Sequence, residues 1–252
     1  MRHLQLPLSV GVGSRCTVEG DDFHYLAHVR RVVSGDEIPV IDRTGAAYLA
    51  IVDEVTRDEI ALSIARPRDS LVIPGAPTIT LYQALPKGRK LEEIVRAAVQ
   101  AGVSRIVPVR TSRTVANPGD RFEARRDRLN RIAREATQQS GAVAASVDRL
   151  IELEEVRPEP DAISLILHVE PLERQSIHSY LSENPRRVEL LVGPEGGLAD
   201  DEISRLIELG FRPVNLGPLV LRTEVAGLYA VAAIRTILLE RDQWQLTTNP
   251  MS

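Results

Sequence analysis

The stretch LLVGPEGGLADDEI, residues 190–203, joins an apolar run, a glycine-rich turn and an acidic helix start. A glycine-rich turn between a strand and a helix is typical of a phosphate site, because backbone N–H groups gather at the helix N-terminus. A phosphate loop of the Walker type needs Lys and then Ser or Thr after its last glycine. Leu198 and Ala199 stand there instead. The sequence therefore predicts a ligand other than a polyphosphate.

The charge of this turn favours a neutral or cationic ligand. Four carboxylates lie in or just after it, at Glu195, Asp200, Asp201 and Glu202, and the last three offset the positive end of a helix dipole. The glycines allow close backbone approach, so N–H and C=O groups can pair with a purine edge or a ribose. We predict an adenosine-like ligand without phosphates. The alternative is a plain tight turn.

A second segment, LGPLVLRTEVAGLYA at residues 216–230, places polar groups at another helix start. Arg222 keeps its proton and presents a planar fork of donors. Thr223 is a good N-cap, and Glu224 suits the helix dipole. All three residues are also compatible with helix-start chemistry alone. The small residues that follow permit close packing against a partner helix, and a second subunit is one source of such a helix.

The histidines and the cysteine predict no further chemistry. His24 and His28 have the i, i+4 spacing of metal ligands on a helix, but no third ligand lies near them in sequence, so no metal site is predicted. His168 ends an apolar run, and we expect it to line the same crevice as the glycine-rich turn. The GxSxG motif of serine hydrolases is absent. Cys16 is the only cysteine, which excludes a disulfide framework.

The elements that must position these residues fall into two parts. Residues 1–66 predict short strands, DEIPVID, AYLAIVDEV and EIALSIA, and one helix, DDFHYLAHVRRV. The helix is expected to have Asp21 or Asp22 as its N-cap and an apolar face of Phe23, Leu26, Val29 and Val33. The proline-rich segment ARPRDSLVIPGAP predicts a linker. We therefore expect one domain over residues 1–70 and a second over residues 71–252.

After the linker, predicted strands and helices alternate. The strands are TITLYQAL, SRIVPV, ISLILHV, VELLVG and PVNLG, and the helices are KLEEIVRAAVQAG, RFEARRDRLNRIAREATQQS, DDEISRLIEL and TEVAGLYAVAAIRTILLERD. Such alternation predicts an α/β fold, with a parallel sheet flanked by helices. Ligands of such sheets bind beyond the carboxyl ends of the strands. The two glycine-containing loops after VELLVG and PVNLG lie at that position.

Charge is unevenly distributed along the chain. The net charge of −4 argues against nucleic acid at first sight, but arginines are concentrated from Arg105 to Arg134, just after the basic stretch PKGRK. One basic lobe on an acidic protein predicts a polyanionic partner, and the alternative is a solvated helix face. No apolar run reaches the roughly 20 residues that cross a bilayer, and the N-terminus lacks a secretory pattern. We expect a cytoplasmic protein without a membrane partner.

Together these motifs resemble a known family. LLVGPEGGLADDEI followed by LGPLVLRTEVA is similar to the cofactor loops of the 16S ribosomal RNA uridine N3-methyltransferases, S-adenosylmethionine-dependent enzymes of the SPOUT class. DDFHYLAHVRRVVSGDEI, PKGRKLEEIVRAAVQAGVSRIVPVRTSRTV and AREATQQSG extend the resemblance in the family's order over nearly the whole chain. It implies an N-terminal PUA-like β-barrel domain that binds RNA, and a C-terminal trefoil-knotted α/β domain that forms a homodimer. Gln100 and Ala142 depart from the family pattern.

The resemblance implies a role for particular residues. S-adenosylmethionine, cationic and free of phosphate, would be bound by His168, Val192, Gly193, Pro194, Gly196, Gly197, Leu216, Gly217, Leu221 and Thr223. Arg222 would stabilise negative charge on the uracil, and Glu224 or Glu195 would accept its proton. Contacts with 16S ribosomal RNA of the small subunit would come from Arg2, His24, Arg30, Arg31, Lys87, Arg89, Lys90, Arg113 and Arg121. No metal is implied.

Three other functions are compatible with parts of the pattern. A SPOUT enzyme of this kind can act on another RNA base or on a ribose 2′-OH. An RNA-binding assembly module would need no cofactor, but the intact GPEGG and LRTE motifs argue against it. A nucleotide hydrolase is disfavoured by the four carboxylates of the glycine-rich turn.

Overall fold

A computed structural model describes most of the chain. The described residues are 3–44, 46–67, 77–115, 122–142, 144–170, 176–183 and 185–241. Arg2, Arg121 and the centre of the expected linker therefore lie outside them. The chain divides into two compact units, one of Met1–Ile73 with Thr137–Ala144, the other of Pro74–Ala136 with Ala145–Ser252.

The first unit is built on a five-stranded sheet in the order β1-β3-β4-β5-β2. The strands are β1 (Leu4–Gln5), β2 (Arg15–Val18), β3 (Glu37–Ile41), β4 (Ala47–Val55) and β5 (Ile60–Pro67). β1 and β3 run parallel, and the other pairs are antiparallel. Alternate residues of β5, Ile60, Leu62 and Ile64, are buried, as a half-buried strand requires. The three strands predicted from the sequence are confirmed.

The helix of this unit differs from the prediction in detail. It consists of α1 (Gly20–His24) followed directly by a π-helix, Tyr25–Arg30. Its N-cap is Glu19, so the expectation of Asp21 or Asp22 was wrong. Of the expected apolar face, Leu26 is buried, but Val29 and Val33 are 64% and 61% exposed. A π-turn has a wider hydrogen-bond spacing than an α-turn, so the 3.6-residue period no longer predicts which side chains face the core.

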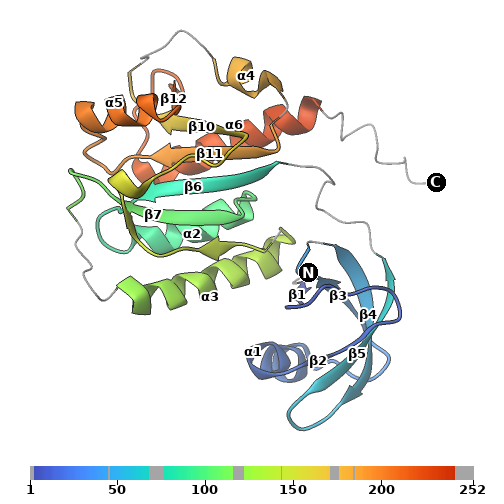
Figure 1. The fold of residues 1–252 in the computed structure, drawn as a ribbon. Coiled ribbons are helices and arrows are strands. Elements are labelled where there is room, and N and C mark those ends of the chain that lie inside the picture. Colours follow the sequence, from blue (N-terminus) through green and yellow to red (C-terminus); the bar gives the residue numbers. More distant parts are fainter. Residues whose placement is uncertain are drawn as a thin grey trace. The chain divides into compact units, whose positions relative to one another are not determined.

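The second unit is an α/β layer structure built on a parallel sheet (Figure 1). The strand order is β12-β10-β11-β6-β7-β8, with β9 pairing with β7, and every pairing is parallel. The strands are β6 (Thr78–Ala84), β7 (Arg105–Arg110), β8 (Ser146–Val147), β9 (Ile151–Glu152), β10 (Ala162–Leu167), β11 (Arg187–Val192) and β12 (Arg212–Val214). The predicted parallel sheet is confirmed, and β8 and β9 are short strands that the sequence pattern missed.

Helices cover both faces of this sheet. They are α2 (Lys90–Gln100), α3 (Phe122–Ser140), α4 (Ile177–Tyr180), α5 (Asp200–Glu208) and α6 (Thr223–Arg241), with 3-10 turns at Leu153–Glu155 and Leu181–Glu183. Apolar residues of α2, α3 and α6 form one core with Ile79 and Leu81 of β6. α5 packs on the opposite face, against Tyr82 of the same strand. No helix in the described ranges is long and apolar enough to span a membrane.

Candidate cofactor pocket

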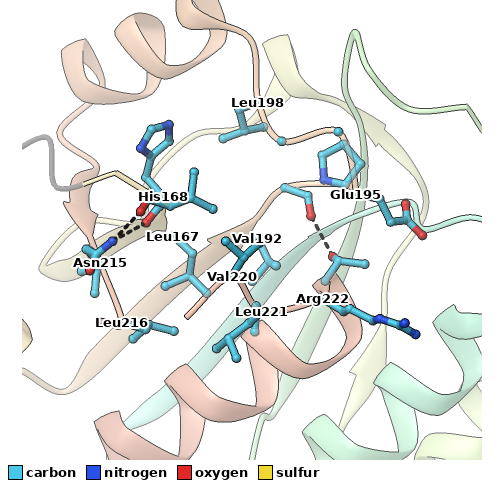
Figure 2. Close-up of a pocket in the computed structure, with 18 of the residues that line it drawn as sticks. Leu167, His168, Val192, Glu195, Leu198, Asn215, Leu216, Val220, Leu221 and Arg222 are labelled. Atoms are coloured by element: carbon cyan, nitrogen blue, oxygen red, sulfur yellow. Dashed lines mark hydrogen bonds between the residues drawn. The ribbon is translucent and has the colours of Figure 1, made fainter. Parts of the chain in front are cut away.

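A cavity of about 440 Å³ lies where three neighbouring parallel strands end (Figure 2). β12, β10 and β11 are adjacent in the sheet, and their last residues, Val214, Leu167 and Val192, all line the cavity. The loops that follow these strands complete its wall. This is the position that the general rule for ligands of open α/β sheets predicts.

The glycine-rich turn forms one wall of the cavity. The N–H of Gly197 donates to the carbonyl oxygen of Pro194 at 2.9 Å, which closes a tight turn, and Gly197 has φ +69°, a value that L side chains rarely adopt. A Cβ on Gly193 would lie 3.3 Å from Cγ of Leu198. Leu198 is buried and fixes the end of the turn. The glycines thus let the backbone itself line the cavity.

The segment after β12 forms the opposite wall. Nδ2 of Asn215 donates to the carbonyl oxygens of His168 at 3.3 Å and Val169 at 2.8 Å. Oδ1 of the same Asn215 accepts from the N–H of Gly217 at 2.8 Å. Gly217 has φ +107°, so the turn requires a residue without a Cβ. Asn215 therefore ties the loop after β10 to the loop after β12, as Figure 2 shows.

Thr223 connects the two walls at the start of α6. Its hydroxyl donates to the carbonyl oxygen of Gly193 at 2.8 Å and accepts from Nε2 of Gln83 at 3.1 Å. Thr223 and Gln83 are both buried. The helix is instead opened by the carbonyl oxygen of Arg222, which accepts from the N–H groups of Val225 and Ala226. The side chain of Thr223 therefore does not cap α6, as was expected, but joins the start of α6 to the glycine-rich turn and to β6.

The charges around the cavity differ from those predicted from the sequence. Of the four carboxylates counted there, only Glu195 lines the cavity. Glu202 is buried and accepts from the N–H groups of Ala199 at 2.8 Å and Ser112 at 2.7 Å. Two cations, Arg113 and Arg222, line the cavity as well. The expectation of a strongly anionic wall was therefore wrong: the Glu202 carboxylate is taken up by backbone N–H groups, and Asp200 and Asp201 are exposed and do not line the cavity.

Comparison with known proteins identifies the family of the chain. Residues 74–235 match the family model of an RNA methyltransferase domain, and residues 18–65 match that of an RNA methyltransferase PUA domain. The chain is 33% identical to the ribosomal RNA small subunit methyltransferase E of Mycobacterium bovis, over 88% of this chain and 86% of that protein. It is 30% identical to the protein of that name from Bacillus subtilis, over 90% and 93%. The chain belongs to this RNA methyltransferase family.

A solved structure agrees with this assignment. The ribosomal RNA small subunit methyltransferase E of Neisseria gonorrhoeae, whose crystal structure is bound to S-adenosyl methionine, is 27% identical and superposes with a TM-score of 0.82. The match covers 94% of this chain and 98% of that one. The predicted fold class, an α/β methyltransferase domain with an N-terminal PUA-like domain, is confirmed.

The cavity of the methyltransferase gathers the residues expected at the cofactor. All ten of them line it: His168, Val192, Gly193, Pro194, Gly196, Gly197, Leu216, Gly217, Leu221 and Thr223. Among the residues expected to act on the substrate, Arg222 and Glu195 line it, and Glu224 does not. In Figure 2 the side chains of Glu195 and Arg222 extend to one side of the cavity, away from His168 and Asn215.

Glu195 and Glu224 share one lysine. Nζ of Lys90 lies 3.1 Å from Oε1 of Glu195 and 3.2 Å from Oε2 of Glu224. Partial burial opposes ionisation of Glu195, but hydrogen bonds from backbone N–H groups and from Lys90 hold its pKa below the usual value. The pKa of Glu224 is also lowered, by its own backbone N–H and by Lys90. Both acids are therefore carboxylates at neutral pH.

The residues expected to contact RNA occur in both units. In the first unit, His24 and Arg31 are exposed and Arg30 is half-buried on or beside the π-helix. The rings of His24 and His28 lie 4.8 Å apart. In the second unit, the described residues Lys87, Arg89 and Arg113 are exposed. Nη1 of Arg113 donates to the carbonyl oxygen of Gly196 at 3.0 Å, which places it against the glycine-rich turn.

Some residues that line the cavity were not predicted from the sequence. Leu167, Val214 and Leu198 complete the apolar wall, and Asn215 organises both loops. Leu167 and Val214 are the last residues of β10 and β12, where strand ends at one sheet edge converge, but the strands predicted from the sequence extended beyond both. Asn215 precedes a glycine by two residues, the pattern of an Asx-turn, and that signal could have identified it.

Proposed function

We propose that this methyltransferase transfers a methyl group from S-adenosylmethionine to N3 of a uridine in 16S ribosomal RNA of the small ribosomal subunit. The observation that carries the proposal is the cavity between residues 193–198 and 215–222, which brings all ten expected cofactor residues together. The named relatives, which are ribosomal RNA small subunit methyltransferases, support the class of substrate.

The residues of the cavity fit this cofactor. About 440 Å³ is within the range of small-molecule sites. The glycines of the turn carry no side chains of their own, so backbone N–H and C=O groups line this wall, and such groups suit the edge of an adenine. Leu216, Leu221 and Val192 provide apolar contacts for its faces. When bound there, S-adenosylmethionine supplies an electrophilic methyl group on a cationic sulfur.

We assign to Arg222 the role of acting on the uracil. It lies at the cavity and immediately before Thr223, whose two hydrogen bonds fix the start of α6. Loss of the N3 proton puts negative charge on O2 and O4 of the base. A guanidinium stays charged at any relevant pH and donates to such oxygens. Arg222 therefore stabilises the form of the base that is nucleophilic at N3.

A water molecule carries the N3 proton away to solvent, and Glu195, which lines the cavity, accepts a hydrogen bond from it, whereas Glu224 lies outside the lining and contacts Lys90. The pKa values of both carboxyl groups lie below the usual range, and a carboxylate with a low pKa is a weak base. Much of the rate then comes from alignment of base and methyl group, since direct transfer needs no covalent intermediate.

RNA is held by basic side chains of both units, and a second copy of the chain completes the assembly. The RNA contacts are His24, Arg30, Arg31, Lys87, Arg89 and Arg113. A run of exposed apolar side chains, Leu219, Val220, Val225, Leu228 and Tyr229, continues from the cavity wall along α6. A patch of this kind marks a protein interface, and we assign it to a homodimer in the cytoplasm.

Nucleoside analysis tests the proposal. Small-subunit ribosomal RNA is incubated with the protein and S-adenosylmethionine carrying a deuterated methyl group, then digested and analysed by mass spectrometry against synthetic standards. We expect the label in N3-methyluridine. Label in a 2′-O-methylated nucleoside or in another base would favour the alternative SPOUT activity, and incorporation into neither would refute methyl transfer to this RNA.

A further inference from the structure

Lys90 joins three segments of the methyltransferase domain. It is the first residue of α2, Glu195 belongs to the glycine-rich turn after β11, and Glu224 lies in the first turn of α6. One ammonium group lies within hydrogen-bond distance of both carboxylates, at 3.1 and 3.2 Å. The side chains of Lys90, Glu195 and Glu224 are 33%, 26% and 19% exposed, so water screens this cluster only in part.

The backbone beside Lys90 strengthens the same connection. The N–H of Lys87 donates to Oε1 of Glu195 at 3.2 Å, the same oxygen that Lys90 contacts. On the cavity side, Thr223 bonds directly to the carbonyl oxygen of Gly193. The turn and the start of α6 are therefore tied together twice, once directly and once through Lys90. Arg222 lies immediately before the tied residues of α6.

Removing the ammonium group of Lys90 would change how the glycine-rich turn and the start of α6 are held together. Glu195 and Glu224 both contact Nζ of Lys90. Removal of that positive charge leaves two neighbouring carboxylates with no cation between them. Like charges repel each other, and more strongly where water is partly excluded. Because Glu195 belongs to the turn and Glu224 to α6, this repulsion favours a larger distance between the two segments.

We infer that Lys90 is a positioning residue, whose ammonium group holds the glycine-rich turn and the Arg222-bearing helix start at a fixed separation. This inference rests on the proposed function, since it concerns the same pocket. It assigns Lys90 to cofactor geometry, whereas the sequence resemblance assigns it to RNA. The two roles differ in what they change. A positioning residue affects cofactor affinity and turnover, and an RNA contact affects RNA affinity and its dependence on salt.

The test compares Lys90→Met with Lys87→Met in the full-length protein. Methionine keeps an unbranched stem and removes the charge. Lys87 is a matched control, because it lies three residues before Lys90 and only its backbone N–H bonds to Glu195. Calorimetry measures S-adenosylmethionine affinity, and RNA binding is measured at several salt concentrations. We expect Lys90→Met to weaken cofactor binding about tenfold, or roughly 1.4 kcal/mol, to lower kcat, and to leave the salt slope unchanged. Lys87→Met should leave cofactor affinity unchanged.

A third variant separates repulsion from simple loss of packing. In the triple variant Lys90→Met, Glu195→Gln, Glu224→Gln, neutral amides replace the facing carboxylates, and cofactor affinity should return part of the way to that of the wild type. The inference is overturned if Lys90→Met binds the cofactor as tightly as the wild type, or if it reduces the RNA salt slope by about 0.7–0.9, the value of one phosphate contact. If the wild type itself fails to bind S-adenosylmethionine, the proposed function fails, and this inference fails with it.

Discussion

Replacing Thr223 with valine tests the hydrogen bonds that join the two walls of the pocket. Valine has nearly the shape of threonine, so the change removes one hydroxyl and little volume. That hydroxyl donates to the carbonyl oxygen of Gly193 at 2.8 Å and accepts from Nε2 of Gln83 at 3.1 Å. Thr223 is 5% exposed and Gln83 is fully buried, so water cannot easily replace the lost partners.

The expected cost follows from the groups left without a partner. A buried polar group that loses its hydrogen bond costs about 1–3 kcal/mol. Gln83 keeps its bond to the carbonyl oxygen of Ala84 at 3.0 Å, so only one of its N–H groups is affected. Rotating the amide does not help, because valine offers no polar atom to either end of it. We therefore expect Thr223→Val to lower the free energy of unfolding by about 2–3 kcal/mol.

Guanidinium denaturation followed by far-ultraviolet circular dichroism measures this change, with Thr223→Ser as the control. Serine keeps the hydroxyl and loses one methyl group, so its cost should stay near 0.8 kcal/mol, roughly that of one buried CH₂. If the valine variant were as stable as the serine variant, the hydrogen bonds of Thr223 would not hold the pocket together, and the reasoning about its walls would be wrong.

Three further predictions concern other positions. Arg222→Ala should lower kcat far more than S-adenosylmethionine affinity, and equal turnover in steady-state assays would remove Arg222 from the chemistry. Burial raises the pKa of Glu189 above its ordinary value, so the stability from its protonated form is present at low pH and lost as pH rises through the raised pKa. Denaturation curves from about pH 4 to about pH 8 should show wild type losing stability relative to Glu189→Gln, whereas a constant difference would contradict this. Gly227 lies within α6, and a Cβ there would meet its nearest neighbour, Cγ2 of Val192, at an ordinary 3.5 Å. Gly227→Ala should therefore raise the free energy of unfolding by about 0.5–1 kcal/mol, and a lower denaturation midpoint would show that the helix cannot accept the methyl group.

Local patterns in the sequence were sufficient to predict the main elements. Alternating burial along β5 and the apolar runs of β6, β10 and β11 are properties of a few neighbouring residues. Gly102 and Gly210 adopt positive φ just after α2 and α5, as helix-ending glycines do. The π-helix at Tyr25–Arg30 could not be predicted this way, because its apolar residues also fit an α-helical period. Leu26 and Val32 pack into the core of the unit, and that tertiary packing is not encoded in the local pattern.

The sequence predicted the residues that line the pocket better than it predicted the charges around it. The two glycine-containing loops follow predicted strands, so their convergence at one sheet edge was expected. The partners of the charged groups are far apart along the chain. Ser112 meets Glu202 across 90 residues, and Lys90 meets Glu195 and Glu224 across 105 and 134. Such pairings depend on tertiary packing, which is why counting carboxylates near the turn overestimated its negative charge.

A crystal structure of the protein grown with S-adenosylmethionine tests the central claim most directly. We predict the nucleoside in the cavity between residues 193–198 and 215–222, with its adenine against backbone groups of the glycine-rich turn. Cofactor bound elsewhere on the chain, or ATP occupying this cavity in a parallel experiment while S-adenosylmethionine does not, would contradict it.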